Sequence, residues 1–273
     1  MFVPLSVEDY LKLPEARPSH RLSYGLDREQ FGDLYLPAGA GPHPVVVLLH
    51  GGCWQAKYAL GPLGGLCAAF AGEGYAVWNL EYRRLGNGGG WPATFLDVAA
   101  GADLLRSISQ RHALDLSRVI AAGHSAGGHL AAWLGARHRL PVTSALVSPG
   151  PLRLRGVLTL AGIIDLAEGM KRKLCGGACG QLLGGTPDQV PDRYAQASPT
   201  ELAPLGIPQW HLAGLADTVV PPDYVQQSSA RMGLSDSVRI EVIGAAGHFE
   251  LVQPSGPAWD AVRTAARRLF GDG

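Results

Sequence analysis

Six short apolar runs, rich in β-branched residues, recur along the chain and alternate with segments of helical periodicity. The runs cover residues 44–50, 75–83, 118–123, 156–162, 207–214 and 238–244. Each is apolar almost throughout, which is typical of parallel strands that are covered on both faces. Helical patterns cover residues 59–74, 92–112, 126–138, 222–233 and 256–270. This alternation predicts an α/β fold: a doubly wound, mostly parallel sheet with helices on both faces.

Three regions depart from this alternation. Residues 20–25 and 31–37 form weaker apolar runs, which could add antiparallel strands at one edge of the sheet. Residues 163–206 contain a glycine-rich stretch but no strong strand, and a plain connection of that length is uncommon. We expect short helices there, forming a small cap over the carboxyl end of the sheet. Residues 1–273 are therefore predicted to form a single domain, with the cap as an insertion.

Composition limits the partners of the chain. Hydrophobic residues make up 47% of it and charged residues 17%, so a large core can form. Lys plus Arg equals Asp plus Glu at 23 each, which leaves no basic field for nucleic acid or an anionic membrane. The first twenty residues show no signal peptide, and no apolar run approaches the roughly 18 residues of a membrane span. We expect a soluble, cytoplasmic protein; a homodimer is left open.

The cysteines at positions 53, 67, 175 and 179 are expected to be reduced thiols. A core of this size does not need disulfides, and no export signal is evident. Cys175 and Cys179 form a C-x3-C pair that could be half of a zinc site. No second pair or histidine cluster lies near it in sequence, so two small residues in a glycine-rich loop are the favoured interpretation, and no metal is expected.

Ser125 lies at the centre of GHSAG (123–127), which matches the pattern G-x-S-x-G. The pattern alone is weak evidence in a chain with 37 glycines. Its context strengthens it, because a strand pattern ends at Gly123 and a helical pattern begins at Ala126. A nucleophile elbow requires this strand–turn–helix arrangement, and the following helix N-terminus favours developing negative charge. We therefore predict that Ser125 is a nucleophile rather than part of an ordinary glycine turn.

A glycine pair in LLHGGCW (48–54) closes an early strand. Such a turn lets backbone N–H groups face a cavity, where they can stabilise the oxyanion that forms when an acyl carbonyl is attacked. Removing one such donor typically costs about 3–4 kcal/mol of transition-state stabilisation. An ordinary glycine turn after a strand is the alternative. We assign the oxyanion hole to the backbone amides of Gly51, Gly52, Cys53 and Ala126.

A serine hydroxyl is a poor nucleophile until a base takes its proton. Asp217 follows one predicted strand and His248 follows the next. The order Ser125, Asp217, His248 is the order of triad residues on successive strand ends of an α/β-hydrolase. We predict that His248 is the general base and that Asp217 fixes its tautomer and stabilises the imidazolium.

Other acids and histidines compete for these roles. Asp165 also follows a strand, but we expect it to cap the helices of the cap segment. Asp223 and Glu250 are the alternatives to Asp217 as the acid. We expect three further histidines near the site to be structural: His50 and His124 as hydrogen-bonding anchors of loops, and His129 one turn into the helix after Ser125.

The residues assembled above resemble the α/β-hydrolase superfamily, and more narrowly its esterase and arylformamidase (kynurenine formamidase) branch. HGGCW (50–54) and GHSAGGHLAAW (123–133) carry the resemblance, and EYRR (81–84) and WPATFLDV (91–98) are similar to the same group. The match spans roughly residues 30 to 270. It implies a serine hydrolase that acts on small acyl esters or amides without a cofactor. Cys53 stands where many related esterases have glycine, which affects substrate preference rather than chemistry, because the donor is a backbone amide.

Four aromatic residues are candidates for binding substrate, although each could instead belong to the core: Trp54, Tyr58, Trp91 and Phe249. A pocket that they lined would suit an aryl or short acyl group. Two other functions are kept as alternatives. One is a serine peptidase of the prolyl-oligopeptidase kind. Such enzymes usually carry an added domain, and this chain has no room for one. The other is a hydrolase fold that binds a ligand with little turnover, a class that often lacks triad residues.

Overall fold

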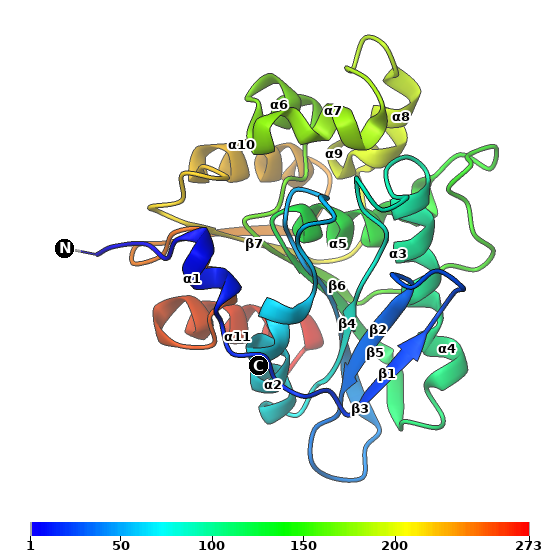
Figure 1. The fold of residues 1–273 in the computed structure, drawn as a ribbon, viewed down its shortest axis with the longest axis vertical. Helices are drawn as coiled ribbons and strands as arrows, with labels where there is room; N and C mark the ends of the chain where they lie inside the picture. Colours follow the sequence, from blue (N-terminus) through cyan, green and yellow to red (C-terminus); the bar gives the residue numbers. More distant parts are fainter. Residues whose placement is uncertain (1, 273) are drawn as a thin grey trace.

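The computed structural model describes residues 2–272 and contains a twisted sheet of eight strands (Figure 1). The order across the sheet is β1-β2-β4-β3-β5-β6-β7-β8. All neighbours from β4 to β8 pair in parallel, whereas β1 and β2 pair antiparallel at one edge. The strands are β1 (His20–Ser23), β2 (Phe31–Tyr35), β3 (His43–Leu49), β4 (Ala76–Leu80), β5 (Leu114–His124), β6 (Gly156–Leu160), β7 (Gln209–Gly214) and β8 (Val238–Ile243).

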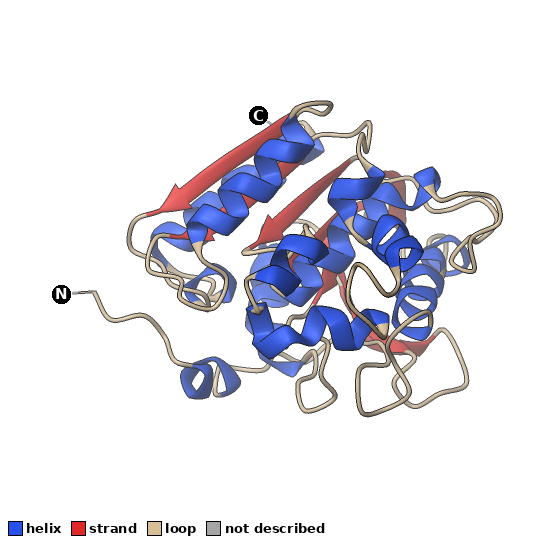
Figure 2. Ribbon diagram, turned by 90° about the horizontal axis from the view of Figure 1, so that it is seen from above, coloured by secondary structure: helices blue, strands red, loops and turns tan. Residues whose placement is uncertain are grey.

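Helices lie on both faces of the sheet (Figure 2). On one face, Phe70 packs edge-on against Trp259 and Glu73 pairs with Arg267 at 2.7 Å, which joins two helices there. The helices of this face are α2 (Gly64–Gly72), preceded by η1 (Gly61–Leu63), and α11 (Gly256–Phe270), preceded by η4 (Glu250–Val252). The other face carries α3 (Ala93–Asp103), α4 (Leu105–Ile108), α5 (Ala126–Ala136) with η2 (Arg137–Arg139), and α10 (Pro222–Gly233).

The sheet confirms the predicted fold class and its physical basis. Residues 45–49 of β3 and 119–122 of β5 are completely buried, and the two strands pair in parallel at the centre of the sheet. Burial on both faces explains why these runs are continuously apolar rather than alternating. The two weak runs near the start form the antiparallel edge strands β1 and β2, as expected.

Residues 163–206 form the short helices expected of the cap segment, and these lie beyond the carboxyl end of the sheet (Figure 1). They are α6 (Leu166–Lys171), η3 (Leu174–Gly177), α7 (Ala178–Leu183), α8 (Pro191–Ala197) and α9 (Pro199–Leu202). The segment is fixed to the helix after Ser125, because His129 Nε2 and Trp133 Nε1 bond to the carbonyls of Ala197 and Gln196 at 2.9 and 3.0 Å. The cap segment therefore has a fixed place above the central strands.

The expectation of four reduced thiols is wrong for two of them. Cys53 and Cys175 form a disulfide with a Cα–Cα distance of 5.7 Å, and 122 positions separate them in sequence. Cys67 and Cys179 are free and buried. The prediction failed because the bond joins the loop after β3 to the cap segment. A count of cysteines does not reveal a contact between segments so far apart in sequence. Cys175 is therefore not half of a zinc site.

Across residues 2–272, no helix combines the length and the apolar character that a membrane span requires. Within the same residues, no three His, Cys, Asp or Glu side chains are grouped as metal ligands would be.

Candidate active site

Ser125 occupies a strained turn between β5 and α5. Its φ and ψ are 55° and −118°, a backbone conformation that side-chain-bearing residues rarely adopt, and its N–H donates to the carbonyl of Leu160 at 2.8 Å. The flanking glycines make the turn fit. A Cβ at Gly123 would lie 2.2 Å from the carbonyl oxygen of Gly127, and one at Gly127 would lie 2.1 Å from that of Leu49. The strain is therefore held in place by backbone packing that excludes any side chain.

The loop after β3 lies directly beside this turn. A Cβ at Gly51 would lie 3.1 Å from the Cβ of Ser125. Gly52, Cys53 and Trp54 then have φ values of 102°, 53° and 55°, which turn the backbone through three successive left-handed residues. Within residues 2–272, no carbonyl or side chain accepts a hydrogen bond from the amides of the predicted oxyanion hole, Gly51, Gly52, Cys53 and Ala126. These four donors are therefore free to bond to an external acceptor.

A buried polar cluster supports the loop from below. The Glu81 carboxylate accepts from His50 Nε2 at 2.8 Å and from the Leu60 amide at 3.1 Å, and it pairs with Arg84 at 2.6 Å. Burial raises the pKa of Glu81, but the positive charges of His50 and Arg84 and the hydrogen bonds outweigh burial and lower it overall. Tyr82 stacks on the His50 ring and donates to the His50 carbonyl at 2.8 Å. Residues 81–84 (EYRR) thus hold the loop that carries the free amides, through their contacts with His50. His50 therefore has the loop-anchoring role that the sequence predicts for it.

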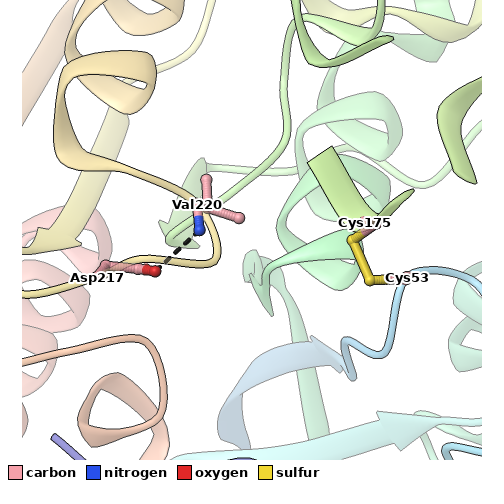
Figure 3. Close-up of a disulfide and its surroundings, with 4 residues drawn as sticks. All are labelled: Cys53, Cys175, Asp217 and Val220. Atoms are coloured by element: carbon pink, nitrogen blue, oxygen red, sulfur yellow. Dashed lines mark hydrogen bonds between the residues drawn. A yellow bond between two sulfur atoms is a disulfide. The ribbon is translucent and has the colours of Figure 1, made fainter. Parts of the chain in front are cut away.

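Asp217 and His248 form a close pair at the carboxyl end of the sheet. His248 Nδ1 lies 2.6 Å from Asp217 Oδ2. The other carboxylate oxygen accepts from the amide of Val219 at 2.8 Å and from that of Val220 at 2.8 Å, and Figure 3 shows the Val220 bond. The Asp217 carboxylate thus contacts three donors, one of them the His248 ring. A hydrogen bond from His248 Nδ1 to this carboxylate leaves Nε2 as the acceptor, which is the tautomer that a general base needs.

The His124 ring packs against the His248 ring. Its ring centroid lies 4.4 Å from that of His248, and its Nε2 bonds to the His248 carbonyl at 3.0 Å. Burial, followed by the charge of His248, holds the pKa of His124 well below its usual range. A neutral His124 donates from Nε2 to that carbonyl and therefore anchors the loop of His248, in agreement with the structural role expected for it.

The Ser125 and His248 side chains line one cavity of about 400 Å³. No hydrogen bond joins the Ser125 hydroxyl to His248 or to any other residue of the range 2–272. Such bonds are often long without substrate and shorten when it binds. The remaining lining residues are Leu5, Ser6, Val7, Tyr10, Gly52, Cys53, Tyr58, His124, Thr218, Val219 and Phe249.

The four aromatic candidates for substrate binding divide into two pairs. Tyr58 and Phe249 line the cavity, as predicted. Trp54 does not: it is completely buried and packs edge-on against His129, because the left-handed backbone at positions 53 and 54 turns it into the core. Trp91 also lies outside the cavity lining and packs against Phe95. The expectation that these two tryptophans line the pocket is wrong.

The competing acids have other positions. Asp165 caps the N-terminus of α6 by accepting from the Glu168 amide, as expected. Asp223 is exposed and pairs with Arg172 at 2.6 Å. Glu250 is buried, but its two oxygens accept from the amides of Gly247 and Leu5 rather than from His248. Among these acids, only Asp217 contacts the His248 ring.

Sequence reasoning missed one wall of the cavity. Residues 5–10 contribute four of its lining side chains, although no strand, glycine turn or known motif marks them. The signal that could have found them was Ser6-Val-Glu-Asp9, whose spacing is that of a capping box and which indicates an ordered helix start. Thr218 and Val219, on the turn that holds Asp217, were missed as well.

The sheet is mostly parallel, has helices on both faces and carries the Ser125 turn at its carboxyl edge. This arrangement places the chain among the α/β-hydrolase folds. The BD-FAE family model matches residues 32–232, which is most of the chain. The chain therefore belongs to the BD-FAE family, an esterase family with this fold.

Similar proteins agree with this assignment. Esterase LipC of Mycobacterium tuberculosis (strain H37Rv) is 24% identical over 256 residues, which are 89% of this chain and 63% of LipC. The chain thus spans less than two thirds of that relative. A truncated carbohydrate esterase from gut microbiota has a TM-score of 0.76 at 20% identity and covers 95% of this chain and 99% of its own. Propionate-bound esterase 2 of Thermogutta terrifontis has a TM-score of 0.72 at 20% identity, with coverages of 96% and 95%.

Proposed function

We propose that the protein is a serine carboxylesterase in which Ser125, His248 and Asp217 form the catalytic triad. The observation that carries this proposal is the 2.6 Å contact between His248 and Asp217, in a cavity that also exposes a strained serine. Residues 1–273 are taken as one hydrolase domain with residues 163–206 as its cap. The triad explains why three segments far apart in sequence end at the same edge of the sheet.

The proposed reaction has two halves. His248 Nε2 takes the Ser125 proton as the hydroxyl oxygen attacks the ester carbonyl, and the resulting oxyanion accepts hydrogen bonds from the free amides around Gly52 and Ala126. Collapse of this tetrahedral species breaks the bond to the alcohol, which leaves with the proton from His248. Water then loses a proton to His248 as it attacks the acyl-enzyme. Collapse of this second tetrahedral species breaks the bond to the Ser125 oxygen, which takes the proton back from His248, and releases the acid.

The size and lining of the cavity support small substrates. About 400 Å³ is at the lower end of ligand pockets, and Tyr58 and Phe249 give it aromatic surfaces. We propose small carboxylic esters as the main substrates, with short acyl chains preferred. Aryl formamides are the second class that the sequence resemblance implies. The similar structures include Thermogutta terrifontis esterase 2 phosphonylated by cyclosarin, and a comparable reaction at Ser125 is part of this proposal.

The disulfide also affects the proposed compartment. The sequence predicts a cytoplasmic protein, but the Cys53–Cys175 bond favours an oxidising compartment, where disulfides persist. The cytoplasmic location therefore stays a prediction, and the disulfide argues against it. Measuring the number of free thiols in protein purified under alkylating conditions tests this prediction.

The experiment measures turnover of p-nitrophenyl acetate and N-formylkynurenine, together with labelling by a fluorophosphonate probe. We expect Ser125→Ala to abolish both turnover and labelling. Ser255→Ala, at an exposed serine without a side-chain capping bond, is the matched control and should keep both. Equal rates for wild type and Ser125→Ala would overturn the proposal. Absence of labelling in folded wild type would favour a ligand-binding protein, and faster cleavage of dipeptide amides than of esters would favour a peptidase.

A further inference from the structure

Residues 4–11, which we call the strap, contribute one wall of the cavity and end in the single-turn helix α1 (Val7–Leu11). A helix this short has little stability of its own. A capping box fixes it: Asp9 N–H donates to Ser6 Oγ at 3.1 Å, and Ser6 N–H donates to Asp9 Oδ2 at 2.9 Å. Its Tyr10 ring stacks on Phe249, near the opposite end of the chain. The strap is therefore an ordered element placed by long-range contacts.

The strap is bound to the loop of His248 through one buried carboxylate. Glu250 Oε1 accepts from the Leu5 amide at 2.5 Å, and Glu250 Oε2 accepts from the Gly247 amide at 2.8 Å. Gly247 directly precedes His248, and a Cβ there would lie 2.6 Å from the Cβ of Pro4. The strap thus packs on backbone that only glycine leaves open. Glu250, 8% exposed, connects the strap to the segment that carries the proposed base.

Tyr10 is the part of the strap that forms the wall of the cavity. Its ring stacks on Phe249 with centroids 4.9 Å apart and planes at 18°, and it lies 6.1 Å from the ring of His124. Tyr10 is only 4% exposed and lines the cavity together with Tyr58. Burial raises the pKa of Tyr10, so its hydroxyl keeps its proton.

We propose that the strap determines specificity: Tyr10 limits the size of the substrate group that fits beside His248, and Glu250 is a positioning residue that holds the strap in place. This inference rests on the proposed function and assigns its substrate class. The esters hydrolysed best are those whose strap-facing group fits beside Tyr10 and Phe249, while bulky ring systems on that side are excluded. Opening the strap enlarges the cavity without touching Ser125, Asp217 or the free amides.

The test measures two ratios of kcat/KM. The acyl ratio compares p-nitrophenyl benzoate with p-nitrophenyl acetate, and the alcohol ratio compares 2-naphthyl acetate with ethyl acetate. We expect Tyr10→Ala to raise one of these ratios by about tenfold or more, since pocket contacts of this size discriminate to that extent. The ratio that rises identifies the group facing the strap. Leu11→Ala is the matched control on α1, because Leu11 is 49% exposed and outside the cavity lining, and both ratios should stay unchanged.

A second pair of variants tests the coupling through Glu250. Leu5→Pro removes the amide donor that bonds to Glu250, whereas Leu5→Ala shortens the same side chain and keeps the donor. Leu5→Pro should raise the same ratio as Tyr10→Ala, and by more than Leu5→Ala does. Unchanged ratios in both Tyr10→Ala and Leu5→Pro, with fluorophosphonate labelling intact, would overturn the role of the strap alone. Wild type that is folded but neither labelled nor active would instead overturn the proposed function.

Discussion

The candidate site has two halves that are built in different ways. In the first half, Ser125, Asp217 and His248 each follow a parallel strand, and glycines let the backbone pass at close distance. The second half consists of the loop of the proposed oxyanion hole and the strap, which are held by contacts between distant segments. The disulfide joins Cys53 to a residue 122 positions away, and the Leu5–Glu250 bond spans 245 positions.

This difference suggests that the two halves have different functions. The first half places the proposed reacting groups at the carboxyl ends of β5, β7 and β8, and β5 and β7 end in buried residues. The second half decides how large the cavity is and how firmly the amide donors are held, and it rests on a few contacts that can be removed singly. Variants should therefore separate chemistry in the first half from specificity and stability in the second.

The largest effect is expected from the acid of the first half. Asp217→Asn keeps the shape of the side chain but loses its charge, so the tautomer of His248 is no longer fixed and the imidazolium is not stabilised. We expect kcat for p-nitrophenyl acetate to fall on the order of a thousandfold or more.

Asp223→Asn is the matched control for this variant. Asp223 is also a carboxylate close to the edge of the sheet, but it is exposed and pairs with Arg172 on the surface. Its substitution should leave kcat within about twofold of wild type, because surface ion pairs contribute little. A loss of activity in Asp223→Asn that matches the loss in Asp217→Asn would contradict the assignment of the acid.

The second half should respond to removal of the disulfide. Cys175→Ala cuts the link between the cap segment and Cys53, and it should lower the free energy of unfolding by about 2–4 kcal/mol. Loosening the loop with the oxyanion donors should also lower kcat, on the order of tenfold. Thermal melts and esterase assays, with and without a reductant, measure both effects.

Cys179→Ala is the control for the cap segment, since Cys179 is a buried free thiol four residues away. It removes similar side-chain volume without removing a bond. Reductant should lower the Tm of wild type and of Cys179→Ala, and should leave Cys175→Ala unchanged. A wild-type melt that is insensitive to reductant would show that the disulfide does not stabilise the folded protein.

The same division decides what the sequence could predict. Strands, the serine turn and the free amides follow from local patterns, because continuous apolar runs imply buried strands and G-x-S-x-G implies a tight turn. Asp217 and His248 could be chosen because both follow strands. Tyr10, Glu250 and the Cys53–Cys175 pair depend on which distant segments meet, and no local pattern encodes that. Trp54 was assigned to the pocket because it adjoins the loop, yet three left-handed residues turn it inward.

Acid should destabilise the folded protein through buried histidines outside the strap, because these side chains fold in their neutral form. Burial lowers the pKa of His211, on β7, to about 3, and that of His129 to about 4. The unfolded chain binds protons at these side chains below the ordinary value of 6.5, and the folded chain does not. The free energy of unfolding should therefore fall as pH decreases from about 6.5 towards 4, by up to about 1.4 kcal/mol per pH unit for each histidine. Urea unfolding at pH 7, 6 and 5 measures this slope.

His211→Gln should make the slope shallower by the share of one histidine, whereas His138→Gln, at an exposed position, should not change it. Equal slopes in wild type and His211→Gln would show that His211 is not responsible for the loss of stability in acid.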